Sequence, residues 1–213
     1  MFETVRNAFK IKDLRKKILY TLFILVVVRI GCQLPIPGVD ADYISQWFAD
    51  QNSLDFFNQL TGGSFEKMSI FALNITPYIT SSIILQLLTI AIPRLEELHK
   101  DGEEGRKKIS EYTRYVTILL SLMESAAMAI GFASQGLLTG GATFTSITVC
   151  IVSMTAGSAL LMWLGEQITE HGVGNGISII LLYNIVSRMP EDMSSLFNKF
   201  VKNASTTVNS LLA

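Results

Sequence analysis

The chain has 213 residues and a formal net charge of −1; 49% of its residues are hydrophobic and 16% are charged, with a mean hydropathy of +0.40. Charged residues make up about 25% of an average soluble domain. So few charges cannot cover a soluble globule of this size, and the high apolar content excludes a disordered chain. The near-zero charge gives no reason to expect direct binding of nucleic acid. The composition therefore predicts an all-α integral membrane protein.

Five apolar stretches predict five transmembrane helices, because a spanning helix needs about 20 largely apolar residues. The predicted spans cover residues 18–34, 75–92, 115–138, 142–165 and 173–189. The first is long enough only if it includes Arg29, whose side chain we expect to reach the outer interface. The last is the weakest, because it is short and opens with Gly174-Asn175-Gly176. A soluble protein with this many buried helices would have almost no polar surface.

The distribution of Lys and Arg predicts the orientation of these spans. The basic segments 1–17 and 93–114 are expected in the cytoplasm, whereas segment 35–74 is acidic and contains Lys67 as its single basic residue. Alternation then makes 166–172 a cytoplasmic turn and 190–213 an external tail, although Arg188, Lys199 and Lys202 count against an external tail. The basic start and Gly31-Cys32 resemble a signal peptide, but Arg29 spoils the cleavage motif, so we expect the first span to be retained.

The segment between the first two spans predicts a re-entrant half-helix. Residues 56–73 are amphipathic, too polar to span a membrane and broken by Gly62-Gly63. Pro77 then disfavours helix at Thr76. Non-helical backbone at membrane depth persists where protein or water covers it, which is typical of a transport pathway. A simple proline kink beside an outer amphipathic helix explains the pattern equally well.

Few residues predict chemistry. Glu124 lies within a predicted span, where a carboxylate can serve a proton relay, an ion site or a buried hydrogen bond. The glycines at 172–176 are too few for a dinucleotide-binding fingerprint and predict a tight turn. His99 and His171 are isolated, without metal-ligand spacing, and no catalytic constellation is visible. Cys32 and Cys150 indicate no disulfide framework. We therefore expect neither an enzyme nor a cofactor. The charged segment 94–114 fits a solvated hairpin or a docking surface for a cytosolic partner.

Several motifs recur in one family in the same order. They are Arg29-Ile30-Gly31, Leu34-Pro35-Ile36-Pro37-Gly38, Gly62-Gly63, Met68-Ser69-Ile70-Phe71-Ala72-Leu73, Thr76-Pro77-Tyr78-Ile79, Ile83-Ile84-Leu85-Gln86-Leu87-Leu88, residues 102–114, and Leu161-Met162-Trp163-Leu164-Gly165-Glu166-Gln167-Ile168-Thr169-Glu170 followed by Gly174-Asn175-Gly176-Ile177-Ser178-Ile179-Ile180. By these motifs the chain resembles the N-terminal half of the SecY family, the channel subunits of the bacterial Sec preprotein translocase. The resemblance covers nearly the whole chain, and the motifs are specific only in combination.

The resemblance implies ten transmembrane helices in two halves around an hourglass pore, of which this chain supplies five and a plug-like half-helix at about 55–73. It implies roles for three groups of residues. The pore ring is Ile75, Ile79 and Leu181; the plug includes Phe57, Leu60, Gly62, Gly63, Phe65, Met68 and Phe71; the lateral gate includes Thr80, Ile83, Gln86, Leu87 and Glu124. A ring of aliphatic side chains resists ions by dewetting and can yield to a peptide. Glu124 stands where Gln is expected more often, which predicts an effect on gate stability.

The implied function is a protein-conducting channel in the bacterial cytoplasmic membrane, which passes unfolded preproteins and releases transmembrane segments laterally. The implied partners are SecE and SecG, the SecA ATPase, the ribosome, signal peptides, preproteins and membrane lipids. The family's second half is not in the sequence, so we expect a fragment, a split chain or part of a larger complex. Two alternatives remain: the N-terminal part of a small-molecule or ion secondary transporter, which needs a polar midplane site, and an assembly subunit without a conduit.

Overall fold

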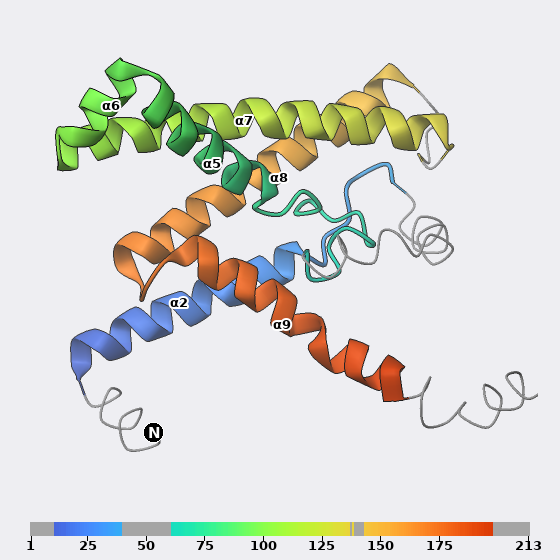
Figure 1. Cartoon of the computed structure of the whole chain (residues 1–213). Helices are drawn as coiled ribbons and strands as arrows, with labels where there is room; N and C mark the ends of the chain where they lie inside the picture. The colour runs from blue at the N-terminus through green and yellow to red at the C-terminus, as the bar shows by residue number, and fades with distance from the viewer. Residues whose placement is uncertain (1–10, 40–60, 137, 139–142, 198–213) are drawn as a thin grey trace, which may run out of the picture.

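A computed structural model of the chain describes residues 11–39, 61–136, 138 and 143–197, and its regular elements are helices (Figure 1). The helices are α2 (Lys12–Gly31), α5 (Thr76–Ala91), α6 (Pro93–Lys100), α7 (Glu103–Ser134), α8 (Phe144–His171) and α9 (Gly176–Phe197). Among the described residues, β-pairing is limited to isolated bridges between Pro35 and Ser69 and between Val39 and Leu138. The prediction of an all-α protein is confirmed.

Two helices, α7 and α8, are long and apolar enough to cross a membrane by themselves. The bent pair of α5 and α6 becomes a third if it counts as one span. Helix α2 begins with several charged residues, and α9 has an apolar part only up to Pro190. Length and composition of the described helices therefore support two or three spans, and the count of five stays a prediction.

The helices extend beyond the predicted spans on the side expected to be cytoplasmic. Helix α7 begins at Glu103, so much of the predicted 93–114 connection is helical, and α8 continues to His171 through most of the predicted 166–172 turn. Hydropathy marks where a chain can meet lipid, whereas a helix continues until its backbone is interrupted. The interruptions here are Gly102 and Gly174, both with positive φ. Between α5 and α6 the axis bends by 102° at Pro93, which has no N–H to continue the helix.

Helix α8 lies at the centre of the described structure. It contacts α7 on one side and α2 and α9 on the other, while α5 and α6 pack on α7 (Figure 1). Two apolar clusters fill the interior. One joins side chains of α7 and α8, and the second joins side chains of α2, α8 and α9.

Residues 61–75, which we call the wedge segment, correct the predicted half-helix. This segment is a succession of turns, because Gly62, Gly63, Met68 and Asn74 all have positive φ. A right-handed helix cannot continue through such residues. The predicted plug residues Phe57 and Leu60 lie outside the described residues.

The wedge segment contributes to both apolar clusters. Met68 packs with α7 and α8, and Phe71 packs with α2, α8 and α9. Close approach to α8 requires Gly157, where a Cβ would collide with the carbonyl oxygen of Ile70. The wedge segment is therefore a structural part of the interior, and it connects the α7 side of the molecule to the α2–α9 side.

Candidate functional site

Two of the three predicted ring residues lie together at the start of α5. Ile75 is 1% exposed, Ile79 is half-buried, and both pack in the cluster formed with α2, α8 and α9. The α9 side chain buried in that cluster is Ile180; Leu181 is half-buried and is not a member. The pairing of Ile75 with Ile79 fits a ring, whereas Leu181 does not join them in this arrangement. Their role in a pore stays a prediction.

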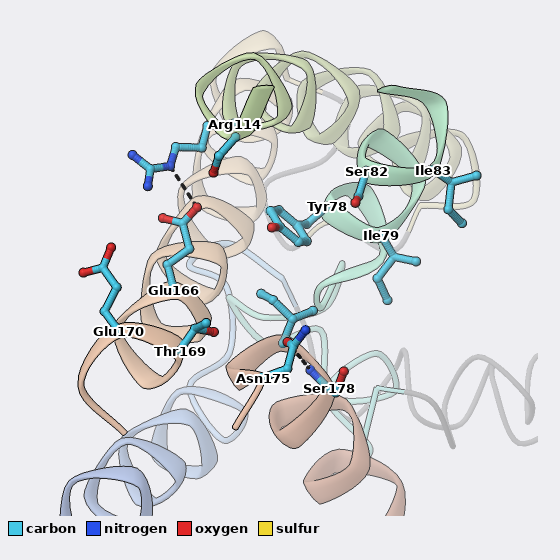
Figure 2. A pocket seen from close by; sticks show the side chains of 12 residues that line it. Tyr78, Ile79, Ser82, Ile83, Arg114, Glu166, Thr169, Glu170, Asn175 and Ser178 are labelled. Carbon is cyan, nitrogen blue, oxygen red and sulfur yellow. Dashed lines mark hydrogen bonds and ion pairs between the residues drawn. The ribbon is translucent and has the colours of Figure 1, made fainter. Parts of the chain in front are cut away.

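Ile79 also lines an open pocket of about 380 Å³ between the ends of four helices (Figure 2). Its other lining residues are Tyr78, Ser82 and Ile83 of α5, Ser110 and Arg114 of α7, Glu166, Thr169 and Glu170 of α8, and Asn175, Ile177 and Ser178 at the start of α9. Its aliphatic side chains come from α5 and α9, and α7 and α8 contribute polar and charged ones. Such a lining offers both an apolar and a charged surface to a molecule that enters.

An ion pair fixes one wall of this pocket. Arg114 Nε donates to Glu166 Oε1 at 2.8 Å, which joins α7 to α8 (Figure 2). This hydrogen bond raises the pKa of Arg114 above its usual range, so the guanidinium is charged throughout the accessible pH range. Glu170 lies on the same wall. The polar wall therefore carries one fixed cation beside two carboxyl groups.

The turn between α8 and α9 forms another wall and confirms the tight turn predicted from the glycines at 172–176. Thr169 Oγ1 accepts the backbone N–H of Gly176 at 2.9 Å, and Asn175 Oδ1 accepts that of Ser178 at 3.3 Å. These bonds satisfy N–H groups of the first turn of α9, which have no partner within the helix. A Cβ at Gly176 would collide with the carbonyl oxygen of Gly165, so the residue allows the close contact of α8 and α9.

The predicted gate residues of α5 form an open face. Ile83 is 52% and Leu87 62% exposed; Gln86 is exposed and Thr80 is half-buried. Thr80 Oγ1 donates to the carbonyl of Thr76 at 3.0 Å, so its hydroxyl is bonded within its own helix. In a membrane protein such an apolar face contacts lipid or another protein. The structure thus places these α5 residues together, and their gate role stays a prediction.

Glu124 lies apart from that face, on α7. It is half-buried and lines an apolar cavity of about 200 Å³. The other lining residues are Thr61, Phe65, Ala72, Leu73, Thr76 and Met128. Glu124 therefore adjoins the wedge segment and the first turn of α5. No group of His, Cys, Asp and Glu residues in the described part of the chain could hold a metal ion.

Sequence reasoning missed a stripe of small residues along α7. Thr113, Thr117, Ser121, Ser125 and Ala129 are all buried and follow one another at intervals of four, on one helix face. Thr117 hydrogen-bonds Ser81 of α5, and Ser125 bonds Thr155 of α8 at 2.9 Å. Small residues let membrane helices approach closely. The four-residue interval was the signal in the sequence that could have revealed the stripe.

Sequence reasoning did not identify the partners of Arg29, and its expected position at the outer interface stays a prediction. Its side chain is half-buried, and Nη1 donates to the carbonyl of Gly62 at 3.0 Å and to Ser187 Oγ at 3.2 Å. The guanidinium thus binds the wedge segment and α9. The remaining described plug residues lie in the wedge segment, with Gly62, Met68 and Phe71 buried and Gly63 and Phe65 half-buried.

Comparison with known proteins decides the family. The SecY family model matches residues 69–213. The chain belongs to the SecY family. The transporter alternative is therefore disfavoured.

Curated SecY relatives support the same assignment. The translocase subunit SecY of Halalkalibacterium halodurans is 41% identical over 208 residues, which cover 96% of this chain and 48% of the relative. That of Bacillus subtilis is 42% identical over 200 residues, covering 92% and 46%. That of Pseudomonas aeruginosa is 42% identical over 189 residues, covering 88% and 42%. The chain thus spans about half the length of the curated relatives it matches.

Solved structures support the fold. Sec61 in a canine ribosome–channel complex from the endoplasmic reticulum matches with a TM-score of 0.58 at 20% identity, covering 93% of this chain and 41% of that one. A structure described as a protein-conducting channel matches with the same score, identity and coverage. At this identity the likeness concerns the fold alone.

Proposed function

We propose that this SecY-family chain forms half of a protein-conducting channel, which passes unfolded preproteins across the bacterial cytoplasmic membrane and releases transmembrane segments laterally. Membership in the SecY family carries this proposal. In this proposal the chain has five transmembrane helices with its N-terminus in the cytoplasm, and a second half completes a ten-helix channel. The chain itself performs no chemistry; the driving force comes from the SecA ATPase or the ribosome.

The proposed passage begins at the pocket in Figure 2 and continues past Ile79. Polar groups at the pocket hold water and accept an extended chain, whereas Ile75 and Ile79 form one side of an aliphatic constriction. Such a constriction excludes ions in the resting state and lets a peptide pass, because aliphatic side chains make no directional bonds that a substrate must break. Leu181 belongs to the same proposed constriction, but it points about 100° away from its neighbour Ile180, which packs in the cluster, so α9 must rotate substantially to bring Leu181 beside Ile75.

The exposed face of α5 is the proposed lateral gate. Ile83 and Leu87 are more than half exposed, and an apolar signal segment or the second half of the channel can cover them. SecE, SecG and lipids are the proposed remaining neighbours. The connection formed by α6 and the first turns of α7 is the proposed docking surface for SecA or the ribosome.

A disulfide cross-link tests the proposal. Cys32 and Cys150 are replaced by Ala, a single cysteine is placed by Ile79→Cys, and the second half and SecE are supplied in membranes. A stalled secretory substrate with one cysteine should cross-link at this position, depending on substrate length. The matched control is Leu160→Cys, at an exposed position on the middle of α8, which should give no cross-link. Failure to cross-link at Ile75, Ile79 and Leu181, with the substrate shown to be engaged, would remove the pore assignment.

A further inference from the structure

Several side chains of α2 and α9 make polar contacts with the wedge segment, although these helices are otherwise apolar over much of their length. Arg29 of α2 donates to the carbonyl of Gly62 at 3.0 Å, and Arg188 of α9 pairs with Glu66 at 3.4 Å. Deeper in the molecule, Asn184 Nδ2 donates to Asn74 Oδ1 at 3.0 Å. The first two contacts hold residues 61–66, and the third holds the C-terminal end of the wedge segment.

The contact at Gly62 is shaped by backbone geometry. Gly62 has φ +65, and a Cβ there would lie 3.0 Å from the backbone oxygen of Asn184. The wedge segment therefore touches α9 backbone to backbone, and its carbonyl points to Arg29. Ser187 Oγ accepts a second bond from Arg29 Nη1 at 3.2 Å and donates to the carbonyl of Asn184 at 2.8 Å. One guanidinium thus connects α2, the wedge segment and α9.

The contact at Glu66 repeats this arrangement from the other helix. The Arg188 side chain is 17% exposed and that of Glu66 36%, so the pair is partly shielded from solvent. The Arg188 side chain also covers Gly63, since its Nη1 would lie 3.5 Å from a Cβ at that glycine. Arg29 and Arg188 therefore hold the same short stretch from two different helices.

The three contacts differ in how easily they can be released. Asn74 and Asn184 are 2% and 1% exposed, and their amides cannot reach water unless the interior opens. Arg29, Arg188 and Glu66 are only partly buried, and their charged groups can exchange these partners for water. Detachment of the stretch 61–66 also breaks the bond from Ser64 Oγ, a residue that is 1% exposed, to the carbonyl of Phe71 at 3.1 Å. The contacts of Arg29 and Arg188 are therefore the part of its attachment that water can replace, while the Asn74–Asn184 pair stays in place.

From this geometry we infer that Arg29 and Arg188 are positioning residues that hold residues 61–66 of the wedge segment against α9, and that loss of these two contacts releases this stretch locally. Only the consequence of the release rests on the proposed function: in a channel, the release of residues 61–66 would loosen the barrier next to the ring formed by Ile75 and Ile79. The local release itself can be measured without any translocation assay.

Hydrogen exchange of the full chain in lipid nanodiscs tests the release. Arg29→Gln and Arg188→Gln should each speed amide exchange within 61–67 by tenfold or more, while amides of α7 and α8 exchange as in the parent chain. Arg114→Gln is the matched control, because it removes an arginine from the other interhelical carboxylate pair, Arg114–Glu166, and should leave 61–67 unchanged. The exchanged pair Glu66→Arg with Arg188→Glu should restore slow exchange, and Arg29→Lys should restore it in part.

Two results would overturn the inference: unchanged exchange at 61–67 in both glutamine variants, or a uniform increase over all helices, which would indicate a general structural role. If Arg29→Gln does not fold, Arg188→Gln and the charge exchange decide alone. Ion leakage through the complete channel in vesicles then separates the two proposals. Faster exchange with leakage supports both. Faster exchange without leakage, and without a cross-link at Ile79, keeps the positioning role and removes the channel function.

Discussion

We expect the Ser81–Thr117 hydrogen bond between α5 and α7 to contribute little to the association of these helices. Both residues are 0% exposed, which would ordinarily mark an important contact. Each hydroxyl also bonds a carbonyl of its own helix, Ser81 to Tyr78 at 2.9 Å and Thr117 to Thr113 at 2.7 Å. Two protons cannot serve three contacts at once, so the interhelical bond forms only when one intrahelical bond is given up.

The expected magnitude follows from this competition. Hydroxyl bonds between membrane helices average about 0.6 kcal/mol in double-mutant cycles, with a maximum of about 1.7. We therefore expect a coupling free energy below about 0.6 kcal/mol for Ser81→Ala with Thr117→Val. Close packing should matter more. Ser121 is 1% exposed, and Ser121→Leu should lower the free energy of unfolding by about 1–3 kcal/mol through overpacking.

Equilibrium unfolding in bicelles measures both values. Ala127→Leu is the matched control for the larger side chain, because Ala127 is exposed on the same helix. A coupling free energy above about 1.7 kcal/mol would refute the competition between acceptors. Equal stabilities of Ser121→Leu and the control would refute close packing along the small-residue stripe.

Two further substitutions test other parts of the structure. Gly157→Val should lower the yield of folded protein severely, because its Cβ would collide with the carbonyl of Ile70. Gly131→Val is the control and should be tolerated, because nothing lies within 4 Å of a Cβ there. Size-exclusion chromatography measures both yields, and equal yields would contradict the contact between Gly157 and Ile70. Glu124→Gln should stabilise the closed gate, since a carboxylate in an apolar membrane cavity is costly, and should lower translocation of a substrate with a weak signal sequence. The expected decrease is about tenfold for each 1.4 kcal/mol, and unchanged translocation would contradict a role in the gate.

Hydropathy predicted where the long helices lie, because lipid imposes a single strong requirement on the sequence. The glycines of 172–176 marked a turn correctly, since these residues constrain the backbone locally. The wedge segment could not be predicted in the same way. Met68 and Asn74 have φ of 43° and 54°; Asn adopts the left-handed conformation more readily than most residues, whereas Met gives no sign of it in the sequence. Both are buried, so tertiary packing holds the conformation.

In the candidate site too, local features could be predicted from the sequence and long-range contacts could not. Ile75 and Ile79 are four residues apart, so a helical turn is enough to bring them together. The contacts of Arg29 could not be inferred, because its partners Gly62 and Ser187 are 33 and 158 residues away. From the sequence alone, the side chain of an arginine near the end of an apolar helix is expected to reach the membrane interface. Only the fold reveals a carbonyl within reach.

The packing of the wedge segment limits how much of it a channel could displace. Met68, Phe71 and Ile75 are each at most 3% exposed, and burial of each such side chain stabilises by about 1.5–3 kcal/mol. Exposing all three to water in a pore would cost about 5–9 kcal/mol, which is comparable to the whole stability of many domains. The same side chains belong to the two apolar clusters, so their removal would leave voids in both. A barrier that opens repeatedly must therefore move the part that precedes Met68, where Arg29 and Arg188 make the contacts that water can replace. In the proposed release, the half of the wedge segment that is anchored by apolar packing and the Asn74–Asn184 pair stays in place, and the half that Arg29 and Arg188 hold moves.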